Sequence, residues 1–252
     1  MRKRILAGNW KMHKTTQDLE GFLAPFMEAS GFQKDSQVEV LLAPPFTLLA
    51  AAKEIATPHG IQIGAQNCHE APEGAFTGEV SIPMLKDLSI DFALIGHSER
   101  RQYYGETNKA VASKVAACLQ NNLRPILCVG ESREERESGL TEKVLETQVG
   151  HVLEMVQDLG NMVIAYEPVW AIGTGLTATN EEAEKAHKFI RSLVAKKDAA
   201  KAASMPILYG GSAKPANIEG LLKQENVDGA LVGGASLKPQ DFGAMVASAL
   251  KG

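Results

Sequence analysis

The chain has little of what marks several common classes of protein. Only three cysteines, Cys68, Cys118 and Cys128, occur in 252 residues. None of them forms a CxxC pair or joins a Cys/His cluster with the spacing of a metal site. Such a sparse, unpaired set favours a reducing compartment. We therefore expect a cytoplasmic protein without structural disulfides and without a bound metal.

Long apolar runs and an excess of positive charge are also missing. The longest apolar stretch, residues 41–52, is broken by two prolines and is too short to cross a membrane. The apolar run after the basic residues 2–4 stops at Gly8, too early for a signal peptide. With 26 basic and 30 acidic residues the formal charge is −4, which argues against a broad nucleic-acid-binding face. We expect neither a membrane nor a nucleic-acid partner.

What the chain does have is a regular alternation of short apolar runs and helical patterns. Runs rich in Ile, Val and Leu recur at residues 4–8, 38–43, 61–65, 92–96, 124–130, 162–166, 206–210 and 230–234. Continuous hydrophobicity is typical of strands buried on both faces, as in parallel sheets. Apolar spacing predicts intervening helices over 16–29, 108–120, 141–159, 180–195 and 239–250, and an Asn-Glu-Glu cap pattern at Asn180 opens the fourth of these.

Eight strand–helix units predict an α/β fold, a closed (β/α)₈ barrel of eight parallel strands with outer helices. No linker or change in composition divides the chain, so we interpret residues 1–252 as a single domain. The alternative is an open, doubly wound sheet. Its glycine-rich signatures are missing, because no GxGxxG follows the first strand and no GxxxxGK[ST] occurs anywhere.

Polar residues and glycines follow five of the expected strands, and parallel strands all end at one mouth of a barrel. They are Asn9-Trp10-Lys11, His97-Ser98-Glu99-Arg100, Glu167-Pro168, Gly210-Gly211-Ser212 and Gly233-Gly234-Ala235-Ser236. Taken alone, each has an ordinary explanation as a helix cap, a structural histidine, a surface lysine or a tight turn. Their convergence on one mouth favours a functional site.

These residue types suit proton transfer beside the carbonyl of a small phosphorylated substrate. Glu167 would take a proton from carbon, because a partly desolvated carboxylate is a stronger base. His97 would donate a hydrogen bond from a neutral ring, since a helix N-terminus disfavours the imidazolium. Lys11 would neutralise the anion, while the glycine turns and Ser212 would hold phosphate. No residue set suits a nicotinamide, a flavin or a metal, so we expect no cofactor.

The apolar segment 168–178 contains two glycines and Trp170. It is either a packed surface loop or, over residues 169–176, a lid that excludes water from a reactive enediolate.

Five motifs, spread from the first strand to the last helix, resemble the triosephosphate isomerase family. They are GNWK at 8–11, GHSERR at 96–101, AYEPVWAIGTG at 165–175, YGGS at 209–212 and LVGGASL at 231–237. The resemblance implies a TIM barrel and an intramolecular aldose–ketose isomerase. The enzyme would interconvert dihydroxyacetone phosphate and D-glyceraldehyde 3-phosphate through an enediolate, in glycolysis and gluconeogenesis.

The resemblance also implies residue roles. Glu167 would be the base and His97 the neutral electrophile, with Asn9 and Lys11 on the substrate and Glu99 supporting the site. The phosphate would be bound by backbone N–H groups of Gly173, Ser212, Gly233 and Gly234. The chain departs from the family pattern near the expected lid, with Leu176, Asn180 and Ala213 where lysine, proline and valine are usual.

A homodimer is implied as well. The loop 67–78 is long and carries Phe76 and Thr77 between two glycines, and a loop of this length needs a role. Either Phe76 folds back on its own barrel, or the loop enters a partner subunit. In the family that the chain resembles, this loop enters the partner, with Thr77 reaching toward Asn9 and Lys11.

Two other functions are compatible with a barrel that binds phosphate. A Schiff-base aldolase would need a buried lysine at the end of a central strand, where this chain has Glu167. A non-catalytic phosphate-binding or scaffold protein would not need both Glu167 and His97.

Overall fold

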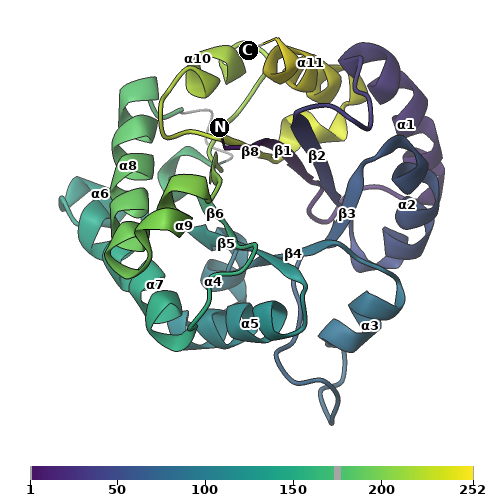
Figure 1. Ribbon diagram of the computed structural model, residues 1–252. Helices are drawn as coiled ribbons and strands as arrows, with labels where there is room; N and C mark the ends of the chain where they lie inside the picture. The colour runs from purple at the N-terminus through teal and green to yellow at the C-terminus, as the bar shows by residue number, and fades with distance from the viewer. Residues whose placement is uncertain (1, 173–176, 252) are drawn as a thin grey trace.

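Eight parallel strands close into one barrel, in which each strand pairs with its neighbours in chain order and β8 pairs with β1. The computed structural model describes residues 2–172 and 177–251. Figure 1 shows the helices forming a ring around the strands. This architecture confirms the predicted (β/α)₈ barrel.

All eight predicted strands form, with ends that differ from the prediction by a residue or two. They are β1 (Arg4–Asn9), β2 (Val38–Ala43), β3 (Gln62–Ala65), β4 (Phe92–Ile95), β5 (Arg124–Val129), β6 (Val163–Tyr166), β7 (Ile207–Tyr209) and β8 (Gly229–Val232). The α-helices of the described ranges are α1 (Thr16–Ser30), α2 (Leu49–Ala56), α3 (Ile82–Asp87), α4 (Ser98–Tyr104), α5 (Asn108–Gln120), α6 (Arg133–Glu137), α7 (Thr141–Met155), α8 (Asn180–Lys197), α9 (Ala199–Ser204), α10 (Ile218–Leu222) and α11 (Pro239–Leu250). Short 3₁₀ turns are η1 (Phe46–Leu48), η2 (Thr57–His59), η3 (Val169–Ala171) and η4 (Gly234–Leu237).

The five predicted helices form with ends within two residues of the prediction, except at the end of α7, and one cap lies at a different residue. Helix α7 stops four residues early, because the backbone at Val156 turns to the extended conformation. The cap of α8 is Thr179 rather than Asn180. The Thr179 hydroxyl accepts the backbone N–H of Glu182, and the Glu182 carboxylate accepts the backbone N–H of Thr179. This reciprocal pair is a capping box, which satisfies two backbone donors at the start of the helix.

The strands are apolar throughout because both of their faces are buried. One hydrophobic cluster fills the barrel interior and includes Ile5, Ala7 and Leu94. The intervening Leu6 belongs to a second cluster, between the strands and the helices. Since side chains alternate along a strand, a parallel barrel needs apolar residues at consecutive positions.

The barrel closes where β1 meets β8, with Ile5 opposite Gly229 and Gly8 opposite Val232. A Cβ on Gly229 would lie only 1.9 Å from the carbonyl oxygen of Ile5, so only glycine permits this approach. Outside the strands, α11 packs against α1, where the Phe26 and Phe242 rings stack with centroids 5.4 Å apart. The first and last elements of the chain are thus in contact both in the barrel, as β1 and β8, and in the helical ring, as α1 and α11.

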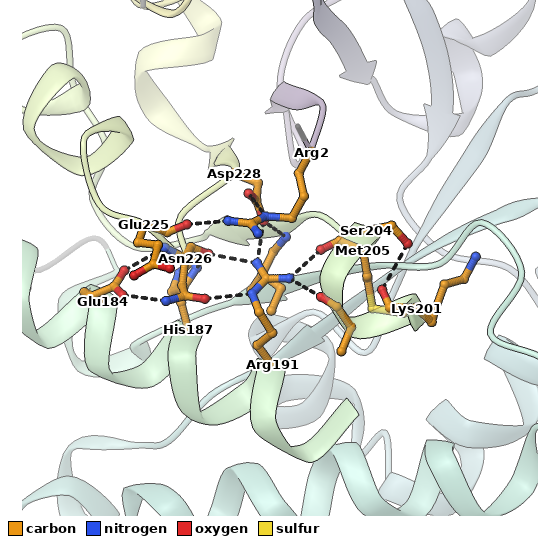
Figure 2. A network of polar contacts seen from close by, with 12 residues as sticks. Arg2, Glu184, His187, Arg191, Lys201, Ser204, Met205, Glu225, Asn226 and Asp228 are labelled. Atoms are coloured by element: carbon orange, nitrogen blue, oxygen red, sulfur yellow. Dashed lines mark hydrogen bonds and ion pairs between the residues drawn. The ribbon is translucent and has the colours of Figure 1, made fainter. Parts of the chain in front are cut away.

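A buried polar network fastens the amino-terminal end of the barrel (Figure 2). The Asp228 carboxylate, just before β8, accepts hydrogen bonds from Arg2 Nε at 2.6 Å and Arg191 Nη2 at 2.6 Å. It also accepts the backbone N–H of Ile207, at the start of β7, at 2.9 Å. Arg191 reaches on to the Asn226 side chain at 2.8 Å. One carboxylate therefore joins the N-terminal segment, β7, β8 and α8.

We expect Asp228→Asn to destabilise the fold by about 3 kcal/mol, because it leaves two arginines without their counter-charge. Thermal denaturation should show a melting temperature lower by about 6–12 °C. Asp35→Ala, at an exposed position, is the control and should shift stability by less than about 0.5 kcal/mol. Equal melting temperatures for the Asp228 variant and the wild type would contradict this role.

Candidate active site

A cavity of about 510 Å³ opens at the carboxyl-terminal ends of the strands. Its lining includes most of the side chains and turns that the sequence predicted as a site: Asn9, Lys11, His97, Glu167, Gly210, Gly211, Ser212, Gly233 and Gly234. Glu99 does not line the cavity but binds Lys11. Gly173 and the second half of the expected lid, residues 173–176, lie outside the described residues.

Glu167 is a buried carboxylate, 2% exposed, directly after β6. Its Oε1 lies 2.9 Å from His97 Nε2, and its Oε2 accepts the backbone N–H of Ser98 at 2.8 Å. Burial acts to raise the pKa of Glu167, but His97, the Ser98 N–H and Lys11 lower it below its ordinary value. The sequence led us to expect a carboxylate made more basic by desolvation. Instead, the groups that contact this carboxylate lower its pKa by more than burial raises it.

His97 is the N-cap of α4, and its ring connects that helix to Glu167. Its Nδ1 accepts the backbone N–H of Glu99 at 3.2 Å, which requires an Nδ1 without a proton. The remaining nitrogen, Nε2, then donates to Glu167 from a neutral ring. Burial lowers the pKa of His97, but the adjacent Glu167 carboxylate raises it above its ordinary value. The Glu167 carboxylate therefore affects the pKa of His97 more strongly than the N-terminus of α4, which we expected to lower it.

Lys11 is held in an unusual backbone conformation beside the cavity, with φ at +51°. Its backbone N–H donates to Asn9 Oδ1 at 3.0 Å, and Gln66 Nε2 donates to its carbonyl oxygen at 2.8 Å. Its ammonium forms an ion pair with Glu99 Oε1 at 2.5 Å. A lysine in the left-handed region is strained, and strain maintained by several contacts is typical of functional sites.

The glycine turns after β7 and β8 bring backbone close to these side chains. A Cβ on Gly210 would lie 2.8 Å from Glu167 Cγ, so this turn leaves no room for a side chain beside the carboxylate. At Gly233 a Cβ would lie 3.5 Å from Lys11 Cε. Ser212 completes the wall between them. The cavity therefore combines a buried carboxylate, an imidazole and an ammonium with side-chain-free backbone.

Sequence reasoning missed some residues that support the site. Gln66 follows β3 and holds the backbone of Lys11 and of Ala43. Glu131 follows β5 and accepts hydrogen bonds from Tyr166 and Trp170, on either side of Glu167. The strand-end rule applied to the third and fifth strands would have found both of them.

Comparison with known proteins agrees with this geometry. The family model described as triosephosphate isomerase matches residues 4–249. A triosephosphate isomerase of Aquifex aeolicus is 45% identical over 98% of this chain and 99% of its own length. Those of Geobacter metallireducens and Xanthomonas campestris are each 48% identical, over 98% and 99% of both chains respectively.

The chain belongs to the triosephosphate isomerase family. This membership confirms the enzyme class and reaction expected from the motifs, the glycolytic interconversion of dihydroxyacetone phosphate and D-glyceraldehyde 3-phosphate. It favours the isomerase over both alternatives, the Schiff-base aldolase and the non-catalytic phosphate-binding protein.

Neither metal ligands nor a membrane span is evident in the described ranges. No three His, Cys, Asp or Glu side chains there are grouped as ligands of one metal ion. No helix there is both long and apolar enough to cross a membrane.

We expect His97 to be neutral, with its proton on Nε2, when a triosephosphate isomerase ligand draws Glu167 away from it. Nitrogen-15 NMR of labelled histidine, with a bound phosphorylated hydroxamate that mimics the enediolate and carries no carboxylate, measures this directly. The His97→Gln variant identifies the resonances. Ligand binding should lower the pH at which the ring protonates, because the ring no longer faces a free carboxylate. A doubly protonated ring in the complex at pH 7.5 would contradict the assignment.

Proposed function

We propose that Glu167 is the base that moves a proton between the two carbons of the triose. The observation that carries this role is the buried carboxylate held between His97 Nε2 and the Ser98 N–H on the wall of the cavity. Substrate would replace the His97 contact, so that Oε1 faces the carbon beside the carbonyl. The carboxylate takes the proton from one carbon and an enediolate forms. The neutral His97 ring gives its Nε2 proton to the former carbonyl oxygen and takes the hydroxyl proton from the other oxygen. Glu167 then returns its proton to the second carbon.

The other polar side chains stabilise the charge that this step creates. The neutral Nε2–H of His97 donates to the oxygen that becomes negative. Lys11 and Asn9 bind the substrate from the end of β1, and Glu99 orients the Lys11 ammonium through their ion pair. Because Lys11, Asn9 and His97 all line the cavity, both substrate oxygens have a donor.

The phosphate is bound by backbone N–H groups of Ser212, Gly233 and Gly234, joined by Gly173. Three of these residues line the cavity, and the missing side chains at Gly233 and Gly234 let a ligand approach the backbone. The nearby Lys11 ammonium adds positive charge in a protein whose formal charge is −4. Phosphate sites after strands seven and eight are frequent in barrels of this kind.

Glu167→Asp tests the assignment of the base. The shorter side chain moves the carboxylate away from the substrate carbon, so kcat should fall by about 100-fold while KM changes little. Steady-state kinetics in both directions measure this. Glu154→Asp, at an exposed position on α7, is the matched control. Near wild-type turnover by the Glu167 variant would reject the role.

We further propose that the enzyme is a cytoplasmic homodimer. Figure 1 shows the segment between β3 and α3 projecting beyond the ring of helices. Within this segment, Phe76 packs on the ring of His69 and stays 48% exposed. Large exposed apolar side chains elsewhere in the first half of the chain include Met12, Met84 and Tyr103. A two-fold pair would bury such loops reciprocally, with Thr77 near the partner's active site.

The three free, buried cysteines are compatible with a reducing compartment.

Thr77→Arg should separate the subunits, because it places a charge at the centre of this contact. Sedimentation at micromolar concentration should show a monomer, and kcat should fall by at least about 10-fold if each site needs the partner's loop. Met155→Arg, at an exposed apolar position on α7, should stay dimeric and active. A Thr77→Arg variant that remains dimeric and fully active would reject the proposal.

A further inference from the structure

Arg136 of α6 lies outside the catalytic cavity, yet it contacts two segments that follow Glu167 in the chain. Its guanidinium stacks over the Trp170 ring at 4.1 Å and forms an ion pair with Glu182 of α8. We propose that Arg136 is a positioning residue for the isomerisation, acting through Glu131 and Trp170 on the turn that follows the base. The proposal rests on Glu167 being that base.

Glu131 holds the turn that follows Glu167 through its carboxylate and its backbone. The Glu131 carboxylate is fully buried, and its Oε1 accepts Tyr166 Oη at 3.0 Å and Trp170 Nε1 at 2.9 Å. Its backbone carbonyl accepts the N–H of Val169 at 3.1 Å. The residue before Glu167 and two residues shortly after it are therefore held by one amino acid. Any displacement of Glu131 would be transmitted to the base.

A buried carboxylate needs a counter-charge, and Arg136 supplies it. Its Nη1 lies 3.9 Å from Glu131 Oε1. The other carboxylate oxygen of Glu131 has no hydrogen-bond partner among the residues that the structure describes. Burial raises the pKa of this carboxyl, while Arg136 acts to lower it. Without Arg136, Glu131 would more readily take up a proton and become a weaker acceptor for Tyr166 and Trp170.

Arg136 also ties this turn to the start of α8. Glu182 Oε2 accepts the Thr179 N–H at 2.8 Å in the capping box, and Glu182 Oε1 forms the ion pair with Arg136. One guanidinium thus joins Trp170 to the first turn of α8. Lysine would not reproduce the arrangement, because only a planar guanidinium stacks on an indole while donating sideways to a carboxylate.

Arg136→Gln, which keeps a polar side chain but loses the charge, tests the proposal. We expect kcat to fall by about 10-fold with KM within about twofold, because positioning of the base matters most in the transition state. Arg136→Lys should restore little of the loss. Arg133→Gln removes an exposed arginine from the same helix and should leave kcat unchanged.

A second measurement reports on the turn itself. The chain has two tryptophans, so fluorine NMR of 5-fluorotryptophan protein resolves Trp170, with Trp170→Phe as the assignment. Arg136→Gln should shift the Trp170 resonance in the absence of substrate, and Arg133→Gln should not. Glu182→Gln, which weakens the other end of the bridge, should shift the same resonance and carries the test if Arg136→Gln does not fold.

The proposal is overturned by wild-type kcat in Arg136→Gln, by an equal loss in Arg133→Gln, or by an unmoved Trp170 resonance. Because that resonance is recorded without substrate, it does not depend on the identity of the base. If Glu167→Asp kept wild-type turnover, Glu167 would not be the base. The fluorine spectra would still show whether Arg136 and Glu182 influence Trp170.

Discussion

Closure of the barrel between β1 and β8 is the constraint on which the rest of the structure depends. Pairing of these strands places Lys11, at the start of the chain, beside Gly233, more than 200 residues later. All eight strands run parallel, so every carboxyl-terminal end reaches the same rim. If the sheet stayed open, Lys11 and Gly233 would lie at opposite edges. Gly229 permits the closure because it has no side chain to meet the backbone of Ile5.

Charged side chains have different surroundings at the two ends of the barrel. At the amino-terminal end, Asp228 is matched by Arg2, Arg191 and a backbone N–H, so buried charge is compensated and contributes to stability. At the carboxyl-terminal end, Lys11 adopts a strained backbone and Glu167 is buried against a histidine. The second arrangement costs stability but places reactive groups around an open cavity. Groups that stabilise the fold and groups that line the cavity therefore lie at opposite ends of the same strands.

The Glu167 carboxylate, the proposed base, depends on backbone groups from neighbouring strand ends as well as on the groups in the cavity. The Ser98 N–H orients one of its oxygens, and the Val129 carbonyl accepts its backbone N–H at 2.7 Å. Glu131 and Arg136 extend this support to the turn beyond it. A reacting group must be held to within a fraction of an ångström, which explains why so many contacts converge on one short segment.

The sequence by itself determined the eight strands, the five longest outer helices apart from some of their ends, the barrel and the residues at its mouth. Burial on both strand faces and the strand-end position are local patterns, readable without coordinates. Only the tertiary structure decided that Glu167 meets His97 and the Ser98 N–H, which lowers its pKa against the effect of burial. It also decided the supporting roles of Gln66 and Glu131. These properties depend on distances between residues far apart in the chain, and such distances exist only once the barrel has closed and its side chains have packed.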